Sequence, residues 1–134
     1  MPKLLHLLES MGYMAVGKRT IELTKVAAAA LAEKLGSEIV AIDLSEQLVL
    51  NQVFLLATGK NEPQLQALSE EVQKKLAEIG EKPARKEGST AWILLDYTDL
   101  VVHIQSTELR NYYMLDRLWN DCPKIELDLV KADR

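Results

Sequence analysis

A histidine, two aspartates and a group of aromatic side chains gather within residues 92–119, and these residue types could do chemistry. His103 stands inside the apolar run LVVHIQ, while Asp96 and Asp99 flank a predicted turn. A histidine beside a carboxylate could act as an acid–base pair. A histidine inside an apolar strand is more often a satisfied structural residue, and aspartates beside a turn are more often turn formers. The residues alone leave both interpretations open.

The rest of the sequence lacks recognisable nucleophile, phosphate and metal motifs. The segment ATGKNEP places a glycine and a lysine after a predicted strand, but it has neither GxxxxGK[ST] nor GxGxxG spacing. No GxSxG elbow accompanies the serines, and no two pairs of His, Cys or carboxylate residues have metal-binding spacing. The sequence therefore predicts no catalytic residue, no cofactor and no metal site.

The aromatic residues are concentrated in the same segment. The chain has two Trp, four Tyr and one Phe, and most of them lie between residues 92 and 119. Trp, Tyr and Arg dominate binding hot spots, so a docking surface is one interpretation, and a packed core is the other. Neighbours on a helix diverge by about 100°, so we expect Tyr112 or Tyr113 to reach the surface. Arg110 near a helix start predicts a carboxylate partner, namely Asp96, Asp99 or Glu108.

The elements that position these residues follow from hydrophobic periodicity and capping signals. We predict a helix from a cap at Thr20 to Gly36, a helix from a cap at Asn61 to Gly80, and a final helix from Ser106 or Thr107 to Cys122-Pro123. Strands are predicted in EIVAIDLS, VFLLATG and PARKEG, with a hairpin in AWILLDYTDLVVHIQ. The continuous apolarity of the first two strands predicts central positions. The segment from VFLLATG to PARKEG predicts a right-handed crossover with parallel strands.

The hairpin decides which side chains share a surface. A turn centred on Tyr97-Thr98 places Trp92 opposite His103, whereas a three-residue loop would shift the pairing by one. Alternation along the strands then puts one set of residues on one face, namely Trp92, Leu94, Val101, His103 and Gln105. The final helix follows closely, so Tyr113 is expected beside Trp92 on one exposed patch, with Arg110 and the Asp96–Asp99 turn at its rim.

The chain length indicates one domain, and the order of predicted elements indicates an α/β fold with a mixed sheet of about five strands flanked by helices. The 134 residues are 48% hydrophobic and 27% charged, as in ordinary globular proteins. We assign residues 1–19 to a flexible N-terminal extension, 20–127 to the domain and 128–134 to a C-terminal tail. The tail KIELDLVKADR, residues 124–134, could form a short edge strand or an ordered arm. No run approaches the roughly 20 apolar residues of a membrane span.

Charge and cysteine content restrict the partners and the compartment. The formal net charge is −4 and no basic run exceeds a pair, so we expect little direct contact with nucleic acid. Cys122 is the only cysteine, which excludes an internal disulfide and fits a reducing cytoplasm.

The segment AWILLDYTDLVVHIQSTELRNYYMLDRLWND resembles the ribosomal silencing factor family, RsfS, also called the Iojap-like family. The shared pattern is a Trp, a strand ending in Asp, a turn with a second Asp, V-V-H, then Arg, Tyr and a Leu-Trp pair. The segment IVAIDLSEQLVLNQVFLLATGKNEPQLQALSEEV also resembles the family, so the resemblance covers roughly residues 20–127. Thr98 departs from the family, which commonly has glycine in this turn.

The resemblance implies a non-enzymatic translational repressor. Such proteins bind the large ribosomal subunit through its fourteenth-numbered ribosomal protein, block joining of the small subunit when nutrients are scarce, and are often homodimeric in isolation. Their fold resembles that of nucleotidyltransferases, and this chain lacks the Gly-Ser and Asp-x-Asp signature of those enzymes. The family's recognition residues correspond to Trp92, Asp96, Asp99, His103, Arg110 and Tyr113. Two alternatives stay open, a large-subunit assembly factor using the same surface and a nucleotide-using transferase.

Overall fold

The computed structural model describes residues 17–46 and 53–129. Expectations for residues 1–16 and 130–134 lie outside the described residues. The helices are α2 (Lys18–Glu33), α3 (Glu62–Glu78), α4 (Thr107–Tyr113) and α5 (Leu115–Leu118). The strands are β1 (Ser37–Asp43), β2 (Val53–Gly59), β3 (Arg85–Gly88), β4 (Trp92–Asp96) and β5 (Leu100–Ser106).

These strands form one five-stranded mixed sheet in the order β1-β2-β5-β4-β3, which confirms the predicted fold class. β2 and β5 are parallel, and the other neighbouring pairs are antiparallel. β3 therefore runs parallel to β2, as the crossover predicted, with β5 and β4 between them. The central position predicted for β1 is wrong, because β1 is the terminal strand. Its outer edge is bordered by the tail, where the Ile125 amide donates to the Ala41 carbonyl at 2.9 Å.

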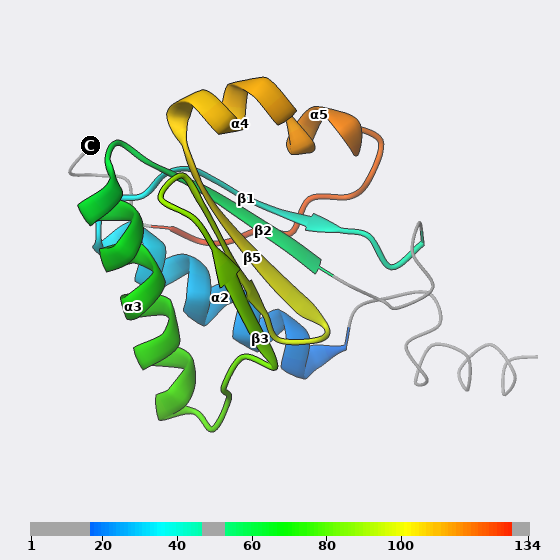
Figure 1. The fold of residues 1–134 in the computed structure, drawn as a ribbon. Helices are drawn as coiled ribbons and strands as arrows, with labels where there is room; N and C mark the ends of the chain where they lie inside the picture. Colours follow the sequence, from blue (N-terminus) through cyan, green and yellow to red (C-terminus); the bar gives the residue numbers. More distant parts are fainter. Residues whose placement is uncertain (1–16, 47–52, 130–134) are drawn as a thin grey trace, which may run out of the picture.

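The two faces of the sheet are covered differently. Helices α2 and α3 pack side by side on one face and enclose the main core with β2, β5 and β4 (Figure 1). The opposite face carries α4 and α5, which bury a smaller cluster of Ile42, Leu44, Leu56 and Cys122. We call this opposite face the second face. Its β4 side is only partly covered, since Trp92, Leu94 and Asp96 alternate there and remain partly exposed.

The boundaries of the long helices follow their capping chemistry. At α3 the prediction is confirmed, because Asn61 Oδ1 accepts from the Gln64 amide at 2.9 Å and Gly80 ends the helix at φ 91°. At α2 the predicted cap is wrong. The helix begins at Lys18, and Thr20 is buried inside its first turn, where its carbonyl accepts from Thr24 Oγ1 at 2.7 Å.

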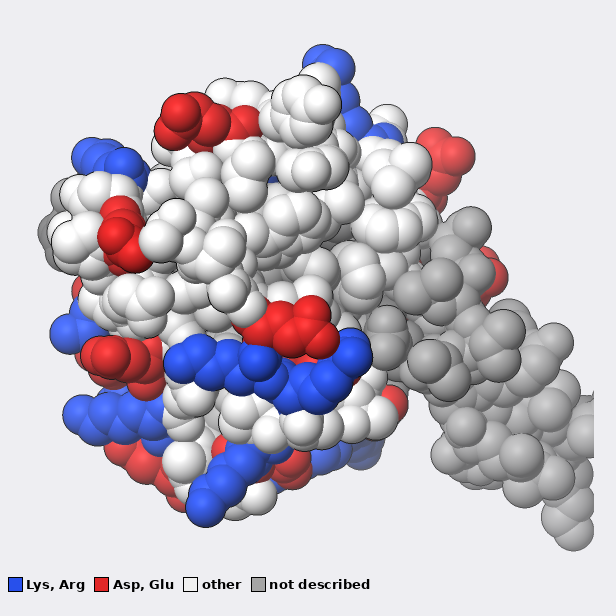
Figure 2. Space-filling model, viewed as in Figure 1, with Lys and Arg blue, Asp and Glu red and all other residues white. Residues whose placement is uncertain are grey.

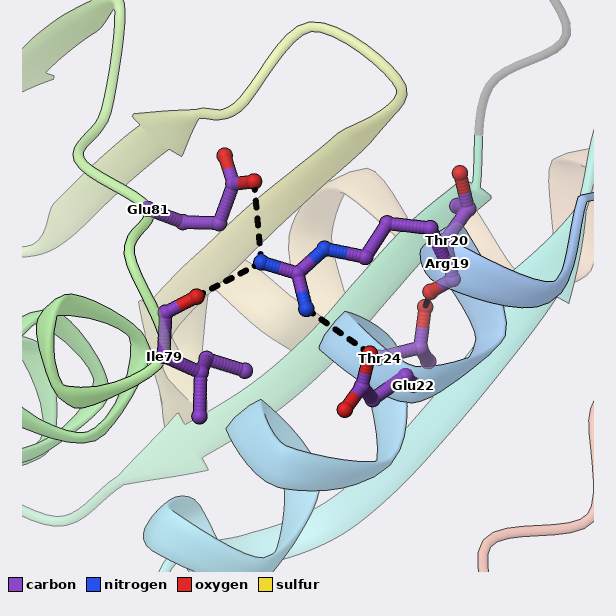
Figure 3. Close-up of polar contacts among 6 residues, drawn as sticks. All are labelled: Arg19, Thr20, Glu22, Thr24, Ile79 and Glu81. Carbon is purple, nitrogen blue, oxygen red and sulfur yellow. Dashed lines mark hydrogen bonds and ion pairs between the residues drawn. The ribbon is translucent and has the colours of Figure 1, made fainter.

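Arg19 joins the start of α2 to the end of α3 (Figure 3). Its guanidinium donates to the Ile79 carbonyl at 2.6 Å and forms ion pairs with Glu22 at 2.7 Å and Glu81 at 3.1 Å. The carbonyls in the last turn of a helix lack partners within the helix, and a cation there also opposes the negative end of the helix dipole. Arg19 was assigned to the extension before the domain, but the structure makes it a contact between two helices.

The hairpin turn lies one residue later than predicted. The Tyr97 amide donates to the Leu100 carbonyl at 2.8 Å, so the loop is Thr98-Asp99. Trp92 consequently pairs with Gln105, and the predicted pairing of Trp92 with His103 is wrong by two positions. The turn forms at this later position because Asp96 Oδ1 accepts a hydrogen bond from the Thr98 amide at 2.8 Å, which closes an Asx turn before the loop. A shift of two keeps every side chain on its predicted face.

Candidate functional site

The chain leaves β5 directly into α4, but the single helix predicted there is wrong. Ser106 Oγ accepts from the Leu109 amide at 3.2 Å, as a cap at this position requires. Met114 then adopts φ 49° and separates α4 from α5. The change of direction allows Leu115 and Trp119 to pack onto the smaller cluster of the second face.

An aromatic patch forms where α4 approaches β4, and we define it as Trp92, Tyr112 and Tyr113. The Trp92 and Tyr113 ring centroids are 5.1 Å apart, and those of Tyr112 and Tyr113 are 4.9 Å apart. Tyr113 is 49% exposed and Tyr112 is 76% exposed. The predicted contact between Trp92 and Tyr113 is therefore confirmed. Exposure of both tyrosines exceeds the prediction, because α4 is attached to the sheet by a different residue.

His103 supports this patch from within the sheet. Trp92 Nε1 donates to His103 Nδ1 at 3.2 Å, and the Phe54 ring packs on the other side with centroids 4.6 Å apart. His103 is only 5% exposed, and this burial lowers its pKa to about 4. A neutral ring is required here, because Nδ1 must accept the indole proton. Within the described residues, no hydrogen bond joins His103 to a carboxylate, so the structure gives it a supporting role under Trp92.

Asp96 and Asp99 lie at the other end of the hairpin. Asp96 pairs with Val101 and Trp92 pairs with Gln105, so the turn and the indole occupy opposite ends of one strand pair. The expectation that the turn borders the aromatic patch is wrong. Trp92 and Asp96 share a face of β4, but each residue adds about 3.3 Å along the strand. The two residues are therefore separated by roughly 13 Å. Asp96 also pairs with Arg85 at 3.4 Å, whereas Asp99 is exposed.

Arg110 is buried, so its expected place at the rim is also wrong. It is 3% exposed, and its Nη1 donates to Thr58 Oγ1 at 2.9 Å. Its carboxylate partner is Asp116, at 3.5 Å from Nε, and not one of the three acidic residues that the sequence suggested. Neither contact had a signal in the sequence. Thr58 comes near only because β2 pairs with β5, and Asp116 only because the chain turns at Met114.

The surface around the aromatic patch is poor in charge. Figure 2 shows an area directly below α4 that is largely free of Lys, Arg, Asp and Glu, with charged side chains gathered further down the same view. Met114 and Leu118 add further exposed apolar side chains on the segment that follows the tyrosines. Exposed apolar groups that gather on one face are typical of a protein-binding surface. Both side chains lie at or just after the break at Met114, and both are exposed.

Among the described residues, no group of three or more His, Cys, Asp or Glu side chains could hold a metal ion. Within residues 17–46 and 53–129, no helix is both long and apolar enough to cross a membrane.

The sequence profile of the family described as "Ribosomal silencing factor during starvation" matches residues 17–134. Two curated relatives named ribosomal silencing factor RsfS are each 35% identical to this chain. The one from Halalkalibacterium halodurans aligns over 81% of this chain and 95% of its own length, and the one from Bacillus subtilis over 78% and 90%. The chloroplastic protein Iojap of Zea mays is 34% identical over 70% of this chain and 44% of its own length.

Two crystal structures have the same fold. A Chromobacterium violaceum protein superposes with a TM-score of 0.71 at 35% identity, covering 83% of this chain and 93% of that chain. A Bacillus halodurans protein superposes with a TM-score of 0.69 at 34% identity, covering 79% and 98%. The family match includes both the hairpin and the α4–α5 segment.

Proposed function

The chain belongs to the ribosomal silencing factor family, and from this premise we propose that it is a translational repressor that binds the large ribosomal subunit. Binding uses the fourteenth-numbered ribosomal protein of that subunit and sterically blocks joining of the small subunit under nutrient limitation. The protein acts in the cytoplasm and forms a homodimer in isolation. These finer statements rest on the resemblance described above, joined to the surface that the structure presents.

The aromatic patch is the observation that supports this function best. Tyr113, in contact with both Trp92 and Tyr112, completes a group with large apolar area and polar tips, the composition that dominates protein–protein hot spots. The surrounding surface carries few charges, which suits a protein partner better than a phosphate backbone. A steric repressor needs only such a surface and enough bulk beside it.

Tyr113 provides the direct test of docking. Truncation of a central aromatic anchor costs about 2 kcal/mol or more, a roughly 30-fold loss of affinity. We therefore expect Tyr113→Ala, and likewise Trp92→Ala, to weaken large-subunit binding by about that factor and to relieve inhibition of subunit joining. Leu35→Ala is the matched control, since Leu35 is also a large exposed apolar residue but belongs to the α2–β1 connection. Unchanged binding by folded Tyr113→Ala and Trp92→Ala variants would place the docking surface elsewhere.

The proposal includes the absence of catalysis. Nucleotidyl transfer needs carboxylates that hold metal ions, and the motifs for phosphate and metal binding are missing from the sequence. We expect calorimetry with ATP, GTP, CTP and UTP in the presence of magnesium to detect no binding. Micromolar binding of any of these nucleotides would favour the transferase alternative.

A further inference from the structure

One buried guanidinium attaches α4 to the sheet, whereas the segment after Met114 packs through Leu115 and Trp119. Arg110 is the buried residue of α4, and α5 has none. Its Nη1 donates to the hydroxyl of Thr58, which is itself 1% exposed and lies next to the end of β2. Surface helices usually dock through an aliphatic stripe. Here the inward side chain of α4 is instead a cation bonded to a hydroxyl.

The same guanidinium spans the break between the two helices. Arg110 Nε lies 3.5 Å from Asp116 Oδ1 of α5, and the Arg110 carbonyl accepts from the Met114 amide at 3.0 Å. The remaining amino group, Nη2, has no hydrogen-bond partner among the described residues. Arg110 thus connects β2, α4 and α5, and within the described chain its side chain reaches the sheet through the hydrogen bond to Thr58.

Tyr113 depends on this attachment for its place beside Trp92. Residues three apart on a helix are neighbours on its surface, so Tyr113 follows Arg110 by one turn. Trp92 is held independently by β4 and by its hydrogen bond to His103. We propose that Arg110 and Thr58 are positioning residues, a buried pair that fixes α4 on β2 and so assembles the aromatic patch from two separate elements. Its consequence for ribosome binding rests on the proposed function.

Thr58 gives the sharper test of the two residues. It lies beneath α4 and is closed to solvent, so it cannot touch a partner and acts on docking only through the helix. Thr58→Val keeps the shape of the side chain and removes the hydroxyl. Thr24→Val is the matched control, because Thr24 is also fully buried and its hydroxyl also makes one hydrogen bond, to the Thr20 carbonyl within α2 (Figure 3).

The free protein shows first whether the pair positions the patch. In the wild type, the Trp92 and Tyr113 rings are close enough for nuclear Overhauser contacts between their protons. We expect Thr58→Val and Arg110→Met to lose these contacts and Thr24→Val to keep them, with all three proteins folded by circular dichroism. Retention of the contacts in folded Thr58→Val and Arg110→Met proteins would overturn the proposal.

Affinity for purified large subunits then tests the consequence. We expect Thr58→Val to weaken binding about tenfold, as for a lost hydrogen bond to a charged group, and Thr24→Val to leave it unchanged. Combined with Tyr113→Ala, Thr58→Val should add no further loss, since both act through the same ring. Multiplying losses in the double variant would overturn the proposed route through Tyr113. If the wild type itself fails to bind large subunits, the proposed function fails, while the proton contacts in the free protein still decide whether Arg110 and Thr58 position the patch.

Discussion

Backbone strain in single residues occurs where non-glycine residues adopt positive φ angles, which glycine adopts more easily. Leu35, Thr98 and Met114 have φ of 65°, 76° and 49°. At Thr98 the Asp99 amide donates to the Tyr97 carbonyl at 3.0 Å, so a β-branched residue occupies the centre of a three-residue turn. A glycine there would adopt this conformation without a clash.

Leu35 offers the cleanest test of this strain. It follows α2 in the left-handed conformation, and it is 70% exposed, so its side chain contributes little packing. Leu35→Gly should raise the free energy of unfolding by about 0.5–1 kcal/mol, because glycine is the preferred residue at this helix end. Urea denaturation measures the change. Lys34→Gly is the control, since Lys34 has φ −95° and should only lose stability. A destabilised Leu35→Gly protein would contradict the strain argument.

His103 should make stability depend on pH. Burial lowers its pKa from 6.5 to about 4, so the unfolded chain binds the proton more tightly than the folded one. Stability is therefore lost as the pH falls, beginning near the unfolded pKa of 6.5 and ending near 4, by about 3 kcal/mol in total. Protonation also makes Nδ1 a donor that faces the Trp92 indole donor.

The His103 contribution can be isolated from that of the carboxylates. Denaturation of the wild type and of His103→Asn between pH 4 and 7 should give curves that converge as the pH falls, because asparagine keeps an acceptor near Nδ1 but does not titrate. Parallel curves over this range would show that the pKa of His103 is not lowered by folding.

At the scale of elements, Arg19 holds the end of α3 against the start of α2. Its pKa is raised by hydrogen bonds to Glu22 and Glu81, and it also caps the Ile79 carbonyl. Arg19→Gln should lower the melting temperature, since it removes the ion pairs and the cap together. Lys18→Gln, at the exposed neighbouring position, should change it little. The difference between the two variants should shrink in high salt, because exposed ion pairs are screened. Equal melting temperatures would mean that the contact does not join the helices.

Element boundaries were predictable where one local hydrogen bond sets them. Asn61 and Ser106 cap α3 and α4 as the sequence indicated, because a cap depends on the next three residues alone. The hairpin register and the break at Met114 were not predictable. The register depends on which aspartate closes the turn, and both Asp96 and Asp99 could have done so. The break accompanies the packing of Leu115 and Trp119 on the second face, a contact that only the tertiary structure defines.

The whole molecule was predictable in class and in part of its site. Alternation along β4 and β5 placed Trp92 and His103 on one face, and the short path into α4 brought Tyr113 beside them. The order of strands could not be predicted from the sequence. An edge strand such as β1, when a tail covers its outer edge, has the same apolar sequence as a central strand. The strand order places Thr58 under Arg110, and Arg110 is therefore buried and not at the surface as the sequence suggested.

Net charge gives a prediction for the molecule as a whole. The chain carries −4, and the surface directly below α4 has few charges (Figure 2). A protein that neutralises 6–10 phosphates loses roughly 10³–10⁵ in affinity between about 50 and 200 mM salt, since it releases counterions. A factor that docks on a ribosomal protein releases few counterions, so we expect its affinity for the large subunit to fall less than about tenfold over that range.

The small remaining salt dependence should reflect Asp99, whose exposed carboxylate can meet basic side chains of a protein partner. Asp99→Asn should therefore flatten the dependence further without altering the contact between Trp92 and Tyr113. Titration of labelled protein against large subunits at several salt concentrations measures the slope, and a steep one would assign the docking surface to ribosomal RNA.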